Sequence, residues 1–268
     1  MPLVAKYNVN ENGPTPRLGH SSAIYGDKLT IFGGHVVDQT ISNDLFTLDL
    51  TTMKWTNEGP QPQVQPLAYM ANTVILDNMK QAIFGGLTQD VDGHFKTTKE
   101  VLFLDLKTHQ WQKPGKVFAE ILEDVPDERM GAEMVYYGDR LWIYAGAQPV
   151  TNDSPTEKTF SDFFSFNIVS GVWKKENGYD AMNDENGEIL GKAVRLYNTD
   201  AAIFLGGCDA EKKTCSFDQG RELLFEQPNA NFVAAPKAEG EGFEGREGHS
   251  LIQLGDSIIS FGGCQFGK

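Results

Sequence analysis

Apolar and polar residues alternate along short segments of this chain, and the first clear example is residues 20–34, HSSAIYGDKLTIFGG. Two alternating runs flank the pair Gly26-Asp27, and the second run ends on two glycines. A period of two residues is that of a β-strand with one buried face, and a Gly-Asp pair between two such runs is typical of a tight hairpin turn. Helical periodicity is largely absent from the rest of the chain. The pattern therefore predicts an all-β fold.

The same unit occurs five times along the chain. The later copies read ANTVILDNMKQAIFGG, AEMVYYGDRLWIYAGA, AVRLYNTDAAIFLGG and HSLIQLGDSIISFGG. The first glycines of the five copies lie 52, 61, 60 and 56 residues apart, at Gly33, Gly85, Gly146, Gly206 and Gly262. Internal repeats with this period are typical of propeller blades.

A second pattern follows each glycine pair in three of the copies, where an Asp or Asn stands six positions before a tryptophan. The pairs are Asp49 and Trp55, Asp105 and Trp111, and Asn167 and Trp173. Each predicts a strand, a short turn and another strand, which makes four short strands per repeat, the β-meander of one blade. We assign these recurring residues a structural role: Gly33, Gly34, Gly85, Gly86, Gly146, Gly206, Gly207, Gly262, Gly263, Trp55, Trp111 and Trp173.

These residues resemble kelch repeats, which carry a double glycine, a following acidic residue with an aromatic strand, and a tryptophan at the start of the outer strand. The segments GPTPRLGHS from Gly13 and GREGHS from Gly245 resemble the Arg-x-Gly-His variant of host cell factor and of Rab-effector kelch proteins. The resemblance implies an all-β kelch-type β-propeller with about five visible blades, the last of them incomplete. Such a chain fits either part of a six-bladed ring or a closed ring of five.

The repeats divide a single expected domain, residues 1–268. Tyr7 aligns with the tryptophan position, so the N-terminal segment is expected to form an outer strand of the closing blade. The expected boundaries are 3–12 for this strand and 17–63, 64–127, 128–190, 191–244 and 245–268 for the repeats, the last one partial.

The formal net charge is −14, from 37 acidic and 23 basic residues. Nucleic acids and anionic membrane surfaces would repel such a chain, so neither is an expected partner. No stretch approaches the roughly 20 apolar residues that span a bilayer, and no signal-peptide pattern opens the sequence. We expect a cytoplasmic, monomeric protein whose partner is another protein, and the charge favours a basic one.

Three cysteines occur, Cys208, Cys215 and Cys264, and an odd number argues against a disulfide framework. Free thiols are the default expectation in the cytoplasm. Cys208 and Cys215 nevertheless lie close enough in sequence to form a bridge in an oxidising compartment.

Long, acidic connections are expected on one face of the propeller, and long loops are where binding residues are often found. One of them, VFAEIL at residues 117–122, mixes apolar and acidic residues. Its acids can steer a basic partner or simply keep a loop solvated, and its apolar residues can anchor a partner or pack on the ring as a short helix. The partner-binding candidates are Phe118, Glu120, Ile121, Glu123 and Asp124.

The sequence contains no nucleophile elbow, P-loop or dinucleotide fingerprint. We therefore name no catalytic or cofactor-binding residue and expect no cofactor. His20 and His249 stand at equivalent repeat positions, which favours a structural hydrogen-bonding role. The segment TQDVDGH lacks the first and last ligands of a calcium-binding EF-hand loop.

One metal candidate is weak. Glu176, Asp180 and Asp184 resemble the spacing with which plant specifier kelch proteins hold ferrous iron, but an Asp stands where the His belongs. Three oxygen ligands suit Ca²⁺, Mg²⁺ or Mn²⁺ better. The favoured function is thus a non-catalytic protein-protein interaction scaffold. The alternative is a metal-dependent enzyme or specifier protein that acts over the central opening.

Overall fold

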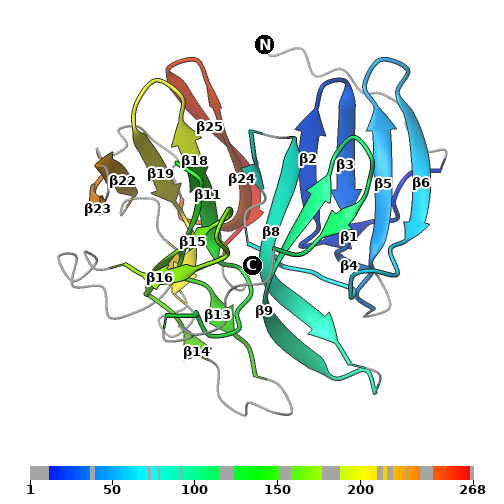
Figure 1. Ribbon diagram of the computed structural model, residues 1–268, viewed down its shortest axis with the longest axis horizontal. Coiled ribbons are helices and arrows are strands. Elements are labelled where there is room, and N and C mark those ends of the chain that lie inside the picture. The colour runs from blue at the N-terminus through cyan, green and yellow to red at the C-terminus, as the bar shows by residue number, and fades with distance from the viewer. Residues whose placement is uncertain are drawn as a thin grey trace.

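The computed structural model contains strands as its only regular secondary structure within the residues it describes, which confirms the all-β fold. Figure 1 shows these strands gathered into sheets that spread outward from the middle of the molecule. The described ranges are 12–36, 40–71, 74–77, 79–90, 92–114, 124–150, 158–176, 188–209, 214–215, 220–226, 229–235 and 244–265.

Four sheets have four antiparallel strands each, and strands that follow one another in the meander lie side by side. The first contains β2 (Ser21–Tyr25), β3 (Lys28–Phe32), β5 (Asp44–Asp49) and β6 (Lys54–Pro60). The other three consist of β7 (Val74–Ile75), β8 (Lys80–Gln89), β9 (Phe95–Asp105) and β10 (Trp111–Gln112); β11 (Glu133–Tyr137), β12 (Arg140–Tyr144), β15 (Phe163–Asn167) and β16 (Trp173–Lys175); and β18 (Lys192–Leu196), β19 (Ala201–Leu205), β22 (Arg221–Glu226) and β23 (Asn229–Ala234).

A fifth sheet has two strands within the described residues, β24 (Glu247–Leu254) and β25 (Ser257–Cys264). We number the five sheets blade 1 to blade 5 in chain order. The first strand of each blade lies innermost, and the inner strands of blades 2 to 5 contact one another in sequence. The blades are therefore arranged around a common centre.

Apolar side chains fill the layers between successive blades, because the two faces of each blade's second strand point to opposite neighbours. Phe32 of blade 1 and Ile83 of blade 2 belong to one buried cluster, and Phe84 of blade 2 and Ile143 of blade 3 belong to another. The recurring tryptophans belong to the same layers. The ring centroids of Phe32 and Trp111 are 4.5 Å apart. Trp111 thus covers the aromatic residue just before the glycine pair of the preceding blade, and Trp173 does the same for Phe84 at 5.4 Å.

The glycine pair, or its Ala-Gly equivalent, follows the end of β3, β12 and β19, whereas in blades 2 and 5 it lies within β8 and β25. In blade 1 the φ angles of Gly33 and Gly34 are +69° and +101°, a region that side chains disfavour. Blade 3 repeats this pair with Ala145 at +58° and Gly146 at +99°. The predicted repeat alignment is therefore wrong by one residue in this blade, since Gly146 is the second member of the pair and Ala145 is the first.

Connections on the two ends of the blades differ in length. The turns between first and second strands are tight, whereas the segments after the glycine pairs add small sheets at the opposite end, which we call the loop face. Figure 1 shows several of these additions in its lower half. The added strands are β1 (Arg17–Leu18) with β4 (His35–Val36), β13 (Ala147–Gln148) with β14 (Lys158–Thr159), and β17 (Glu188–Ile189) with β20 (Cys208–Asp209) and β21 (Thr214–Cys215).

Candidate interaction surface on the loop face

A chain of backbone hydrogen bonds links all five blades at the loop face. Each N–H donates to the carbonyl of the equivalent residue in the preceding blade, at 2.7 to 3.0 Å, and each of these residues has a φ between +52° and +64°. The participants are Gly19, Tyr69, Gly131, Leu190 and Gly248. Because these residues lie at the entrance to the inner strands, the chain of bonds fixes where each inner strand begins.

Two oppositely charged residues lie at this entrance, the buried Glu133 of blade 3 and the half-buried Lys192 of blade 4. Glu133 is 1% exposed, and a Cβ atom on Gly191 would lie 2.1 Å from its Oε1. Burial lowers the pKa of Lys192, and the nearby carboxylate of Glu133 opposes that shift. The two opposite charges therefore attract each other across the junction of blades 3 and 4.

His249 is also buried, with 1% of its surface exposed. A Cβ atom on Gly206 of the preceding blade would lie 2.5 Å from its Cε1, so the ring packs against that glycine. Burial, followed by the charges of Lys192 and Arg246, lowers the pKa of His249 to about 4. The equivalent residue of blade 1, His20, is exposed. The two histidines thus share a repeat position but differ in their surroundings.

The buried histidine predicts a pH dependence of stability. A neutral His249 is favoured in the folded chain, whereas the unfolded chain takes up a proton at a pKa near 6.5. The contribution of neutral His249 to the free energy of unfolding is therefore complete above pH 6.5 and is lost as the pH falls toward 4. This loss is at most about 3 kcal/mol. Urea unfolding at pH 7 and pH 4.5 measures it. The His249→Asn variant is expected to lose less stability over this interval, and an equal loss would contradict the assignment.

Among the predicted partner-binding residues, Asp124 lies within the described part of the chain and is half-buried at the entry to blade 3. Phe118, Glu120, Ile121 and Glu123 lie outside the described residues. Their role stays a prediction.

The metal candidates are not brought together within the described residues. Glu176 is 9% exposed; its Oε1 accepts a hydrogen bond from Ser165 Oγ at 2.6 Å and its Oε2 accepts one from Lys174 Nζ at 2.5 Å. Asp180 and Asp184 lie outside the described residues. Both carboxylate oxygens of Glu176 are therefore engaged within blade 3.

A second group of potential metal ligands stands at the tip of the β8–β9 hairpin, where Asp90, Asp92 and His94 bring ligand atoms within 4.8 Å of one another. Asp90 Oδ1 accepts the backbone N–H groups of Asp92 and His94, both at 2.9 Å. These bonds are those of a tight turn, and they account for the cluster without a metal.

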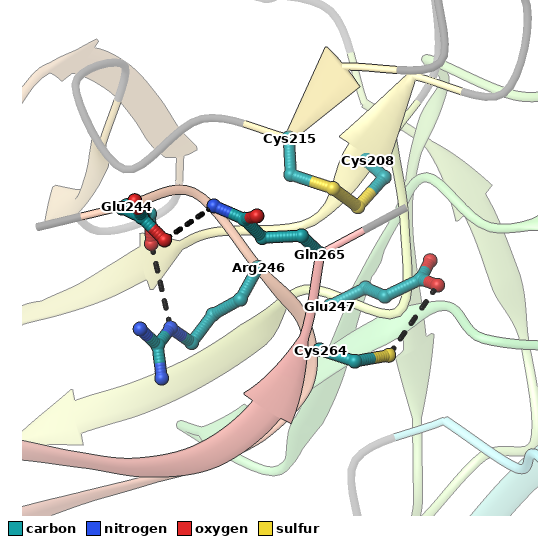
Figure 2. The surroundings of a disulfide bond; sticks show 7 residues. All are labelled: Cys208, Cys215, Glu244, Arg246, Glu247, Cys264 and Gln265. Atoms are coloured by element: carbon teal, nitrogen blue, oxygen red, sulfur yellow. Dashed lines mark hydrogen bonds between the residues drawn. A yellow bond between two sulfur atoms is a disulfide. The ribbon is translucent and has the colours of Figure 1, made fainter. Parts of the chain in front are cut away.

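Cys208 and Cys215 face each other on β20 and β21 and form a disulfide, so the default expectation of free thiols is wrong for this pair. Figure 2 shows the bridge beside the start of blade 5. Cys264 follows the glycine pair of blade 5 as Cys208 follows that of blade 4. It is a free, exposed thiol, and its Sγ lies 3.9 Å from Glu247 Oε1.

Three arginines share a bracing role that the sequence reading missed. The Nη1 atom of each arginine donates to a backbone carbonyl 16 positions later, at the first residue of the blade's glycine pair. These acceptors are Gly33, Ala145 and Gly262. Their Nε atoms donate to the carbonyl two positions earlier. The signal in the sequence was the constant distance between an Arg-x-Gly segment and the glycine pair. The arginines are Arg17, Arg129 and Arg246.

Comparison with known proteins identifies the repeats. The family model described as "KLHDC2/KLHL20/DRC7 Kelch-repeats domain" matches residues 3–115 and 72–268. Kelch repeat-containing protein 2 of Saccharomyces cerevisiae is 28% identical over 56% of this chain and 18% of its own length. Kelch domain-containing protein 3 of Homo sapiens is 29% identical over 60% of this chain and 41% of its own. Kelch-like protein terF of Aspergillus terreus is 24% identical over 98% and 54%.

The chain thus spans about half, or less, of the length of these curated relatives. Among solved structures, "Structure of YjhT" matches with a TM-score of 0.70 and 17% identity, over 94% of this chain and 74% of that one. This likeness confirms the β-propeller fold. Within the described residues there is no helix long and apolar enough to cross a membrane.

Proposed function

Because the chain belongs to the kelch-repeat family, we propose that it is a non-catalytic scaffold that binds a protein partner through its loop face. The observation that carries this proposal is the concentration of long connections on one end of blades whose inner strands are tied together by backbone hydrogen bonds. A rigid platform with variable loops is a common way to present binding residues.

The charge of the loop face favours a basic partner. The inter-blade segments 114–129, 176–192 and 237–248 contain 14 acidic and five basic residues. Within the described residues, Arg129 pairs with Asp162, and two of the acidic residues pair with lysines: Asp127 with Lys158 and Glu176 with Lys174. The three segments keep an excess of acidic residues, and their field would speed the approach of a basic surface.

Charge reversal tests this proposal. Partners are captured from a native lysate, and their association with the chain is followed by surface plasmon resonance at several salt concentrations. Glu123→Lys with Asp124→Lys is expected to slow association about 10-fold at low salt and to flatten its salt dependence, because long-range attraction acts on the approach of the partner.

The matched control is Asp27→Lys with Asp256→Lys, which changes the charge equally at exposed tight turns on the opposite end of the blades. Equal slowing in both variants would show that only net charge matters. Unchanged association in the loop-face variant would remove the steering argument.

A metal-dependent function is disfavoured, because both carboxylate oxygens of Glu176 already accept hydrogen bonds from Ser165 and Lys174.

A further inference from the structure

A groove opens between blades 1 and 2 at the end of the blades opposite the loop face, and we call it the turn-end groove. It encloses about 670 Å³ and is lined by β5, β6 and the tight turns of both blades. Thr47 lines it and is 7% exposed, yet its Oγ1 has no hydrogen-bond partner in the part of the chain that the structure describes. Buried hydroxyls are usually paired, so this one marks the groove as incomplete.

The repeat position of Thr47 differs in character from blade to blade. It is the residue of the third strand that pairs two positions before the aromatic end of the second strand. In blades 1 to 4 this residue is Thr47, Phe103, Ser165 and Leu223. Phe103 and Leu223 are buried apolar residues that fill the layer themselves. Blade 3 therefore offers the polar counterpart with which blade 1 can be compared.

In blade 3 four side chains join in one hydrogen-bonded network. Arg140 Nη1 donates to Ser165 Oγ at 2.8 Å, and Ser165 Oγ donates to Glu176 Oε1 at 2.6 Å. The network ends in a primary ammonium group, because Lys174 Nζ donates to Glu176 Oε2. The hydroxyl and the carboxylate thus have all their partners within the blade, and a lysine completes the set.

Blade 1 has the counterparts of these positions but lacks the ammonium group. Thr56 stands opposite Thr47 in the sheet, as Lys174 stands opposite Ser165. A threonine side chain is too short to reach where a lysine reaches, and it carries no charge. Blade 1 therefore supplies no cation from this position.

The carboxylate of the network is present in blade 1 as Glu58. It stands three positions after the outer-strand tryptophan, as Glu176 does in blade 3. Glu58 lines the turn-end groove with 31% of its side chain exposed, and its Oε1 lies 3.5 Å from His109 Nδ1 of blade 2. The groove thus presents the carboxylate and the hydroxyl of the blade 3 network without the lysine.

The other charged residues of the groove lie nearer its mouth. Lys28 and Asp49 pair with each other. Lys54 stands opposite Asp49, which is two residues closer to the turn than Thr47, and it is exposed, as are Asp27 and Lys107. Beside Glu58 the groove consequently favours a cation, and the net charge of −14 attracts one from a distance.

We propose that the turn-end groove binds a primary ammonium group, supplied by a lysine side chain of a partner or by a free alkylamine. The ammonium takes the place that Lys174 Nζ has in blade 3 and donates to the carboxylate of Glu58 and the hydroxyl of Thr47. An ammonium group has three donors, and its hydrogen bonds to a carboxylate are among the strong ones. Rotation about χ1 turns the Thr47 hydroxyl toward the groove that this residue lines. Because the groove lies opposite the loop face, this binding is separate from the proposed partner binding.

The test follows the backbone amides of the ¹⁵N-labelled chain by NMR at pH 7 while Nα-acetyl-lysine amide is added. Saturable shifts are expected at Thr47, Thr56 and Glu58. Nα-acetyl-norleucine amide has nearly the same alkyl chain without the ammonium group and is expected to cause none. n-Butylamine distinguishes the two sources: equal affinity supports a free alkylamine as a sufficient ligand, and weaker affinity supports a lysine within a polypeptide.

Two variants test the contacts. Thr56→Lys restores in blade 1 the lysine that blade 3 has and is expected to weaken binding of the lysine derivative at least about 10-fold, because its own ammonium occupies the position. Glu58→Gln is expected to weaken binding by a similar factor. The matched control is Ser170→Lys, which adds the same charge at an exposed turn of blade 3 and is expected to bind normally. Amide spectra show that each variant keeps the fold, since Thr56 and Ser170 are exposed.

Four results would overturn the proposal. Amides of Thr47, Thr56 and Glu58 that do not shift with the lysine derivative would show that the groove binds no ammonium group. Equal binding of the norleucine derivative would assign it to alkyl chains. Sodium acetate that shifts the same amides more strongly would assign it to anions at Lys54 and Lys107. Equal weakening by Thr56→Lys and Ser170→Lys would mean that net charge alone governs binding.

Discussion

Removing the carboxylate of Asp162 is expected to lower the free energy of unfolding by about 3–5 kcal/mol, the usual cost of leaving one member of a buried ion pair without its partner. Arg129 is fully buried, and its two terminal nitrogens bind the two carboxylate oxygens of Asp162. The guanidinium also lies 3.9 Å from the centre of the Phe160 ring. In Asp162→Ala the charge stays in the blade, where it still donates to the backbone carbonyls of Asp127 and Ala145. Urea unfolding followed by circular dichroism measures the loss.

Asp127→Ala is the matched control for this prediction. Asp127 pairs with Lys158 at 2.7 Å, but both side chains are more than half exposed. Exposed pairs contribute about 0–1 kcal/mol, so the control is expected to unfold almost as the parent chain does. Similar losses in the two variants would mean that burial adds nothing to the Arg129–Asp162 pair.

Gly33→Ala is expected to destabilise the chain by at least about 2 kcal/mol more than Gly26→Ala does. Both glycines have a left-handed φ, +69° at Gly33 and +58° at Gly26, so the conformational cost of about 1 kcal/mol is common to both. The added Cβ differs in its surroundings. At Gly33 it would lie 2.3 Å from Leu67 O, and at Gly26 it would meet nothing within 4 Å. The extra loss measures the clash with the backbone of blade 2, which cannot move aside as a flexible side chain can.

Thermal and urea unfolding of the two glycine variants provide the comparison. Equal losses would show that the close approach of blades 1 and 2 at Leu67 tolerates a methyl group. They would also remove the structural explanation for the recurrence of glycine at this position.

Much of the fold could be predicted because the repeat imposes the same physical demands in each blade. Tight turns between alternating runs predicted the hairpins, and the recurring tryptophan predicted an outer strand. The structure adds the reason for that recurrence: Trp111 covers Phe32, and Trp173 covers Phe84, across the layer between blades. Period and pattern are visible in a single sequence because each blade must bury its own share of these layers.

What could not be predicted depends on backbone conformation and on contacts between blades. Ala145, Tyr69 and Leu190 have positive φ angles at positions where other blades use glycine. The residue types alone do not indicate such a conformation. Arg129 is one basic residue of an acidic segment in the sequence, and its pairing with Asp162 becomes visible only when the two segments meet in the fold. The bridge between Cys208 and Cys215 likewise could not be predicted, because the two residues face each other only through the pairing of β20 with β21.

The link between successive blades at the loop face uses main-chain atoms alone, from Gly19 to Gly248. Tyrosine and leucine occupy two of its five positions, so the link places few demands on side chains. A gene that duplicates or loses one repeat would keep every donor and acceptor that the next junction needs. This main-chain link would therefore allow the number of blades to change during evolution, while the loops diverge independently.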